Sequence, residues 1–265
     1  MTDTLATWHY GLMARWWSEF NVDGPEIAYF RRFIEGEGQP ALDVACGTGR
    51  LLLPYLRAGL DVDGCDVSAD MLAHCRARAA QEGLQPRLYE QAMHELSLPR
   101  TYRTIIVCGS FGLGGNRDWN VEALRRFHRH LEPGGRLVLD NEVPYANAGL
   151  WRYWPADERR QLPRAWPETG TRKQTRDGSE LELRARLVDL DPLEQVATLE
   201  MRIGLWRDGH LLAEEERILK ETLYFKHELV HLLERAGFSD IDAQAGYTGA
   251  APTPDDKVLV FVATK

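Results

Sequence analysis

The chain has 265 residues, which is enough for one sizeable α/β domain with a smaller elaboration or for two modest domains. Hydrophobic residues make up 44% and charged residues 27%, the mix of a globular protein that buries a core. The formal net charge of -8, with no block of Lys and Arg, disfavours nucleic acid and anionic membrane surfaces as partners.

The N-terminal residues 1–9 contain neither a basic segment nor an apolar segment, so we expect no signal peptide there. No stretch approaches the roughly 20 apolar residues that a membrane span needs. The cysteines form no C-x-x-C pair, and we expect them to be reduced thiols packed as small hydrophobes. They are Cys46, Cys65, Cys75 and Cys108. The expected location is the cytoplasm.

The first 140 residues predict helices followed by alternating strands and helices. Apolar residues at helical spacing predict a helix over 4–20, and a second helix ends near Ile34. Short apolar runs then predict strands at 41–45, 61–65, 86–89, 104–108 and 136–140. Helices are expected between them at 50–58, 69–82 and 121–130. This alternation indicates parallel β-α-β units and a sheet covered by helices on both faces.

The alternation of strands and helices ends after residue 140. Residues 155–176 are polar and irregular, whereas 181–187 and 197–205 alternate apolar and polar residues with the period of half-buried strands. The Asp208-Gly209 dipeptide favours a tight hairpin. We therefore expect an antiparallel meander of about three strands, in or beside the main sheet. The last part returns to a helix at 227–236 and to strands near Ile241 and at 258–263.

A glycine-rich turn, Asp43-Val44-Ala45-Cys46-Gly47-Thr48-Gly49-Arg50, follows the first strand, at the edge where α/β sheets bind ligands. A dinucleotide-binding turn would need a small residue where Leu52 stands, and no phosphate-binding lysine follows. Asp66, at the end of the second strand, stands where a carboxylate accepts hydrogen bonds from ribose hydroxyls. Asp43 is expected to face the same crevice. Two carboxylates without a phosphate-binding device favour a cationic nucleoside over a dinucleotide.

These motifs resemble the class I S-adenosylmethionine-dependent methyltransferases, in which a D/E-x-G-x-G-x-G stretch passes under the amino-acid part of the cofactor. The stretch from Asp43 to Gly49 fits this pattern, with Ala45 in place of the first glycine. Asp66-Val67-Ser68 looks like the family's ribose-binding segment, and the Pro133-Gly134-Gly135 turn is similar to the one that precedes its fifth strand. Gln91 stands where the adenine-contacting segment usually has Asp. The resemblance covers residues 41–140 well and the last forty residues more loosely.

The resemblance implies a doubly wound, Rossmann-like α/β fold, with a mostly parallel seven-stranded sheet and an antiparallel β insertion after the fifth strand. It implies a helical cap over 1–38, a cofactor-binding domain over 39–142 and 222–265, and an insertion over 143–221 on the substrate side. The expected cofactor is S-adenosyl-L-methionine. Its expected contacts are Asp43, Ala45, Cys46, Gly47, Gly49, Asp66, Val67, Gln91, Ala92, Met93 and Cys108.

Four residues are expected around the reacting atom. In related enzymes an N-terminal helix closes over the cofactor and often contributes a tyrosine, and His9 and Tyr10 stand at that place. Ser110 and Glu142 follow the fourth and fifth strands, whose carboxyl ends flank the methyl group. The alternative for Glu142 is that it is only a solvent-exposed residue of a loop. Trp16 and Trp17 are expected in packing.

Two further features have competing interpretations. The aromatic residues of 145–154 either wall a substrate or form the core beneath the insertion; they are Tyr145, Trp151, Tyr153 and Trp154. His227-Glu228-Leu229-Val230-His231 spells the H-E-x-x-H zinc motif. Helical periodicity places both histidines opposite the apolar stripe, toward water. No H-x-x-G-x-x-H extension supplies a third ligand, and nothing in the sequence supports a later acidic one. We therefore expect no metal site.

The sequence thus predicts an enzyme that transfers a methyl group from S-adenosylmethionine to a nitrogen or oxygen of a small molecule by in-line displacement. Glycine and deoxysugar N-methyltransferases share the antiparallel insertion, which makes a small amine or sugar the expected acceptor. The alternatives are a non-catalytic protein that senses the cofactor, and a methyltransferase acting on RNA or protein. We expect no nucleic-acid or membrane partner, and a monomer or homodimer.

Overall fold

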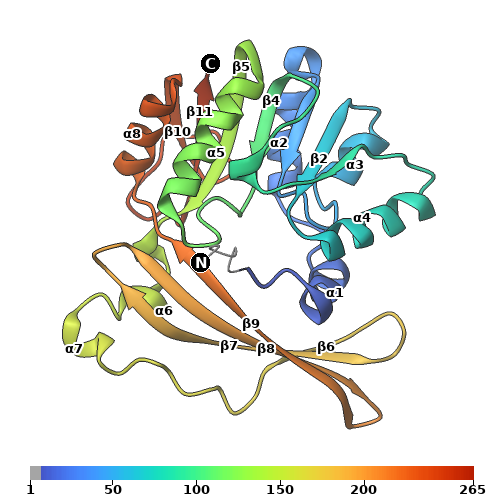
Figure 1. The fold of residues 1–265 in the computed structure, drawn as a ribbon, viewed down its shortest axis with the longest axis vertical. Helices are drawn as coiled ribbons and strands as arrows, with labels where there is room; N and C mark the ends of the chain where they lie inside the picture. The colour runs from blue at the N-terminus through green and yellow to red at the C-terminus, as the bar shows by residue number, and fades with distance from the viewer. Residues whose placement is uncertain (1–6) are drawn as a thin grey trace.

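The computed structural model describes residues 7–265 and contains a seven-stranded sheet in the order β10-β11-β5-β4-β1-β2-β3 (Figure 1). Its strands are β1 (Ala41–Val44), β2 (Val62–Asp66), β3 (Leu88–Glu90), β4 (Tyr102–Val107), β5 (Leu131–Glu142), β10 (Ser239–Ala245) and β11 (Val258–Thr264). The pairs within β1 to β5 are parallel, whereas β11 lies antiparallel to β5 and β10. The expected Rossmann-like α/β architecture is confirmed.

Helices cover both faces of this sheet and create two hydrophobic cores. Ala41 and Ile106 pack into one core with α2 (Glu26–Ile34), α3 (Leu52–Arg57) and α4 (Ala69–Gln81). Their chain neighbours Leu42 and Ile105 pack into the other core with α5 (Arg117–His130) and α8 (Lys226–Ala236). Successive strand residues point to opposite faces, so continuous apolar runs fill both cores. Within residues 7–265, no helix combines the length and apolar character of a membrane span.

The Pro133-Gly134-Gly135 segment, expected as a turn before the fifth strand, lies inside β5 as an irregularity. β4 and β5 pair at Tyr102 and Leu131 and again from Thr104 and Arg136, so the register shifts between these pairs. The Gly135 carbonyl accepts a hydrogen bond of 2.9 Å from the Lys265 N–H, which ties this irregularity to the chain end. The strand therefore begins earlier than its apolar pattern predicts.

The first helix, α1, covers Gly11–Phe20 and is shorter than predicted, since residues 7–10 are not helical. Residues 1–6 lie outside the described part of the chain. Gly11 adopts a left-handed backbone with φ +56°. Its N–H donates to the Asp70 carboxylate at 2.7 Å, and the next N–H donates to Glu215 at 3.3 Å. Carboxylates favourably occupy a helix N-terminus, so these two contacts explain where α1 begins.

The residues between β5 and α8 form a second, separate antiparallel sheet in the order β6-β7-β8-β9, which lies below the main sheet in Figure 1. Its strands are β6 (Thr171–Gln174), β7 (Glu180–Asp191), β8 (Val196–Arg207) and β9 (His210–Thr222). This is one strand more than expected, because polar β6 lies in a segment interpreted as irregular. The short helices are α6 (Ala148–Trp151), α7 (Ala156–Arg159), η1 (Gly36–Gly38), η2 (Met93–Glu95) and η3 (Pro144–Ala146).

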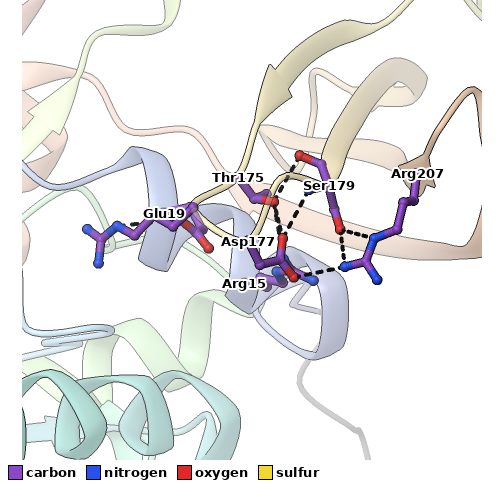
Figure 2. Close-up of polar contacts among 7 residues, drawn as sticks. Arg15, Glu19, Thr175, Asp177, Ser179 and Arg207 are labelled. Atoms are coloured by element: carbon purple, nitrogen blue, oxygen red, sulfur yellow. Dashed lines mark hydrogen bonds and ion pairs between the residues drawn. The ribbon is translucent and has the colours of Figure 1, made fainter.

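Helix α1 is attached to this second sheet at the turn between β6 and β7 (Figure 2). Arg15 donates to Asp177 at 2.9 Å, and the same carboxylate accepts hydrogen bonds from the Thr175 hydroxyl at 2.6 Å and the Ser179 N–H at 3.1 Å. Arg207 of β8 approaches Asp177 at 3.3 Å from the other side. Apolar residues of α1, β7 and β8 form a shared core beneath these contacts. The N-terminal cap and the insertion therefore pack as one unit.

Candidate functional site

A cavity of about 460 Å³ lies at the carboxyl ends of the parallel strands. One side is formed by the turn after β1, the end of β2 and the segments after β3 and β4. The other side is formed by the N-terminal segment, α1 and the second sheet, through Trp8, Trp17, Leu199 and Leu219. Ligands of α/β sheets bind at this edge because the loops after neighbouring strands meet there.

The glycine turn lines the cavity with a left-handed backbone. Ala45 has φ +57° and Gly47 has φ +53°. The Gly47 N–H donates to the Asp66 carboxylate at 2.9 Å, which ties the turn to the end of β2. Gly49 lies outside the cavity lining, and a Cβ there would meet the Cys75 Sγ at 2.7 Å and the Leu53 Cγ at 2.8 Å. Its lack of a side chain therefore serves the packing between helices.

Two buried carboxyl groups stand at the cavity. One oxygen of Asp43 has no hydrogen-bond partner among the described residues, and burial raises the pKa of this group to about 8. The nearby Asp66 charge acts in the same direction. Burial also raises the pKa of Asp66, although hydrogen bonds from Ser68 and Gly47 oppose the shift. Such a pair suits a ligand that brings a positive charge and hydroxyl groups.

The segments after β2 and β3 contribute apolar walls. Val67, Ala92 and Met93 line the cavity with apolar side chains. The Gln91 side chain is bonded to the backbone of Ser97, accepting at 2.8 Å and donating at 3.3 Å. The side-chain amide of Gln91 therefore links the two ends of the loop over 91–97, and the remainder of Gln91 lines the cavity. Cys46 and Cys108 also line the cavity, and burial raises the pKa of both thiols.

The structure brings two of the four expected catalytic residues to the cavity. Ser110 lines it with a hydroxyl that is buried and has no partner among the described residues. His9 lines it as well, but its ring accepts from the Trp8 Nε1 at 2.9 Å and contacts the Thr7 Oγ1 at 2.7 Å. Burial lowers the pKa of His9 to about 4, so the ring is neutral near pH 7. Both ring nitrogens are engaged within the chain.

The other two expected catalytic residues, Tyr10 and Glu142, lie outside the cavity lining. Tyr10 is the N-cap residue of α1 and is half-buried, and burial together with the Asp66 and Asp70 charges raises the pKa of its phenol. Glu142 ends β5 with an exposed side chain. Trp16 is in the packing core as expected, whereas Trp17 packs there and also lines the cavity.

Sequence reasoning missed the residues that long-range packing brings to the cavity. They are Glu221 of β9 and His94, Trp119 and Asn120 beside the segment after β3. The rings of His94 and Trp119 stack with centroids 4.4 Å apart. Glu221 follows Leu219 by two residues on the same strand, so both side chains face the same way. No apolar alternation marks this strand in the sequence, because Glu215 and Arg217 lie on the same face as Leu219 and Glu221.

The remaining sequence features belong to packing or to the surface. Tyr153 and Trp154 pack into the core beneath the insertion, whereas Tyr145 and Trp151 are exposed, and none of the four lines the cavity. His227 and His231 are exposed on α8, as predicted. Among residues 7–265 no group of three His, Cys, Asp or Glu side chains is arranged to hold a metal. The four cysteines are free thiols.

Known methyltransferases are similar to this chain in sequence and in fold. Residues 41–135 match a family model described as a methyltransferase domain. Over 123 residues the chain is 30% identical to a dTDP-3-amino-3,4,6-trideoxy-alpha-D-glucopyranose N,N-dimethyltransferase of Streptomyces venezuelae. That alignment spans 46% of the chain and 50% of the relative, so the chain spans about half the length of this curated relative.

Two solved structures are similar over nearly their whole length. An S-adenosylmethionine-dependent methyltransferase from Clostridium acetobutylicum superposes with a TM-score of 0.73 at 16% identity, covering 96% of this chain and 97% of that one. A sugar N-methyltransferase from Streptoalloteichus superposes with a TM-score of 0.69 at 19% identity, covering 100% and 95%. Residues 41–135 thus match a methyltransferase domain, and the chain as a whole shares the fold of these methyltransferases.

Proposed function

We propose that this protein transfers a methyl group from S-adenosyl-L-methionine to a nitrogen or oxygen atom of a small molecule and releases S-adenosylhomocysteine. The Asp43 carboxyl group carries the proposal, because it is buried at the cavity with one oxygen lacking a partner among the described residues. An ammonium group placed there satisfies that oxygen and favours the ionised carboxylate. Asp66 keeps free lone pairs, beyond its two backbone contacts, for hydroxyl groups.

The cavity lining supports the rest of the cofactor site. The backbone of Ala45, Cys46 and Gly47 would lie against the amino-acid part of the cofactor, and Val67, Ala92 and Met93 would enclose its base. Gln91 and Cys108 would complete the lining, while Gly49 acts through the shape of the turn. When bound, the cofactor supplies an electrophilic methyl group on a sulfonium. These residues fit it because they combine carboxylates with apolar walls.

Transfer of that methyl group is an in-line displacement, so alignment and exclusion of water supply much of the rate. Trp8 and Trp17 close the cavity from the N-terminal side, and Leu199 and Leu219 close it from the second sheet. Ser110 offers a hydroxyl without a competing partner among the described residues. The cap over 1–38 and the insertion over 143–221 thus form the substrate side in this proposal, with 39–142 and 222–265 as the cofactor domain.

Similar proteins support a small acceptor. The Streptomyces venezuelae relative is named for an amino sugar carried on dTDP, and the Streptoalloteichus structure is named as a sugar N-methyltransferase. The acidic balance of this chain, with a formal net charge of -8, favours such an acceptor over RNA.

Two measurements test the proposal. Calorimetry should detect binding of S-adenosylmethionine to the parent protein and at least tenfold weaker binding to Asp43→Asn at pH 8, because a charge-assisted hydrogen bond contributes about 1.5–3 kcal/mol. Incubation with methyl-labelled cofactor and pools of small amines, amino sugars and alcohols should transfer label and release S-adenosylhomocysteine. Tight binding without transfer to any pool would instead support a cofactor sensor. Transfer to RNA or protein alone would contradict the small-molecule acceptor.

A further inference from the structure

The wall of the cavity opposite the glycine turn is apolar and contains one carboxylate. Leu199 of β8 pairs with Leu219 of β9, and Glu221 follows Leu219 on the same face of the strand. All three line the cavity. Leu113, from the loop after β4, forms an isolated bridge with Glu221 and also lines the cavity. Glu221 therefore shares this wall of the cavity with three leucine residues.

This carboxylate has no ion-pair or hydrogen-bond partner among the described residues that explains its position. On β9 the adjacent Lys220 faces the opposite way, toward a surface hollow lined with Asp189 and Asp191. From β5 the Glu142 carboxylate adds a like charge, which acts with burial to raise the pKa of Glu221 to about 7. From the N-terminal segment His9 faces the cavity as a neutral ring. Arg217 lies on the same face of β9 but is ion-paired with Glu215 at 2.9 Å, and no ion pair joins a described cation of these elements to Glu221.

A second polar group without a partner among the described residues lies in the loop after β4, which meets β9 at the Leu113–Glu221 bridge. Ser110 is 8% exposed and lines the cavity, and its buried hydroxyl has no hydrogen-bond partner among the described residues. The Ser110 carbonyl accepts from the Leu113 N–H at 3.3 Å, and Leu113 bridges to Glu221. One short turn thus connects the two groups. An unpartnered hydroxyl and carboxylate in an apolar wall are the usual signs of a polar ligand group.

The charges of the lining favour a cation over an anion. Its acidic side chains are Glu26, Asp43, Asp66 and Glu221. Arg50 is the one Lys or Arg among the lining residues that the structure describes, and it is ion-paired with Glu26. An acceptor with a carboxylate or phosphate at the reacting end would meet uncompensated negative charge, whereas an amine would be attracted.

We propose that Glu221 binds the amino group of the acceptor and removes its proton, with Ser110 as an additional hydrogen-bond partner, so that the acceptor is an aliphatic amine with an apolar body. This inference rests on the proposed methyltransferase function and narrows its acceptor from nitrogen or oxygen to an amine nitrogen. The leucine side chains around Glu221 contact the carbon skeleton, and the carboxylate selects the charged end. Glu221 is therefore both a specificity-determining and a catalytic residue.

The chemical step balances with the groups present. The bound primary ammonium gives one proton to the Glu221 carboxylate and becomes a neutral amine with a free electron pair. That pair forms the new N–C bond while the C–S bond breaks and its electrons stay on sulfur, which gives S-adenosylhomocysteine. The product leaves as a secondary ammonium ion, and Glu221 returns its proton to water. A carboxyl group with a pKa near the working pH suits this exchange.

Binding to the protein loaded with S-adenosylhomocysteine tests the proposal. The probes are cyclohexylamine and cyclohexanol, which share a carbon skeleton and differ in the charged group. We expect cyclohexylamine to bind at least tenfold more tightly than cyclohexanol at pH 8, and its affinity to rise as the pH increases through about 7. In Glu221→Gln the preference and the pH dependence should both disappear. Glu221→Asp, which keeps the charge, should restore part of the preference.

Glu142→Gln is the matched control, because it removes a neighbouring carboxylate that lies outside the cavity lining. It should keep most of the preference for the amine. Binding of S-adenosylmethionine should change by less than about threefold in all of these variants, which also demonstrates folding. Equal binding of the two probes by the parent, or an unchanged preference in Glu221→Gln, would overturn the proposal. Absence of cofactor binding by the parent would instead contradict the proposed function itself.

Discussion

The backbone of the glycine turn allows a quantitative test at Ala45, where the chain departs from the D/E-x-G-x-G-x-G pattern. Ala45 replaces the first glycine and has φ +57°, a left-handed conformation that costs an L-residue about 1–2 kcal/mol. Ala45→Gly removes this strain, but the added freedom of the unfolded chain offsets about 0.4–1 kcal/mol. We therefore expect a net gain in the free energy of unfolding of about 0.5–1 kcal/mol. For a chain of 265 residues this corresponds to a rise in Tm of about 1–4 °C.

The reverse change two residues later should have the opposite sign. Gly47 has φ +53°, and a Cβ there would stand 3.0 Å from the Met71 Cε, which must move. Gly47→Ala should therefore lose about 1–2 kcal/mol from the backbone alone. Gly59→Ala is the matched control, since Gly59 has φ +77° and no atom within 4 Å of an added Cβ. It isolates the backbone strain from the loss of space.

Urea unfolding and calorimetric titration with S-adenosylmethionine separate stability from binding. Ala45→Gly should retain cofactor affinity within about threefold, whereas Gly47→Ala should weaken it by more than about tenfold, because its methyl group would displace Met71 and both residues line the cavity. Gly59→Ala should leave affinity unchanged. A destabilised Ala45→Gly variant, of the kind found at unstrained positions, would refute the strain argument.

Three further predictions concern charged groups. In the folded state burial holds the pKa of Asp43 at about 8, above its value of about 3.8 in the unfolded chain, so this group lowers stability progressively as the pH rises from about 4 to 8. Asp43→Asn should therefore gain about 1–3 kcal/mol over the parent between pH 5 and pH 7 in urea unfolding, and a constant difference would contradict this. Asp177→Ala should speed hydrogen exchange in α1 and in the β6–β7 turn while leaving β1 and β4 protected, because it removes the acceptor of Arg15. His227→Ala and His231→Ala should retain methyl transfer, and transfer should survive chelators; loss in either assay would revive a metal site.

The parallel half of the fold was predictable because its signals are local. Apolar runs such as 41–45 fill two cores at once, and this demand leaves a continuous pattern in the sequence. The cap and the second sheet were less predictable. α1 begins at Gly11 because carboxylates of Asp70 and Glu215, distant in sequence, meet its first N–H groups. β6 is polar and exposed, so its pairing with β7 leaves no hydrophobic alternation to detect.

The candidate site shows the same contrast between local sequence signals and contacts of residues that are distant in sequence. The residues expected to hold the cofactor come from turns directly after strands, and all of them except Gly49 line the cavity. Gly49 shares the motif but packs against Cys75 and Leu53, and the motif alone does not distinguish these two uses of glycine. The sequence predicts Glu142 as a catalytic residue because it ends a strand near the expected methyl group. Glu221 reaches the cavity from the second sheet, through a pairing that the sequence pattern does not specify.

The contacts of helix α1 and the N-terminal segment hold the two walls of the cavity together. Helix α1 is bound to α4 through Gly11 and Asp70, and to the second sheet through Arg15 and Asp177 (Figure 2). Ser68, two residues after Asp66, donates its hydroxyl to the His9 carbonyl, so the N-terminal segment is also tied to the end of β2. The cap therefore connects the two walls of the cavity by contacts with both. If the proposed in-line displacement is correct, we expect this cap to act through positioning, because it fixes the second sheet relative to β2 and displacement requires the acceptor atom to align with the methyl group.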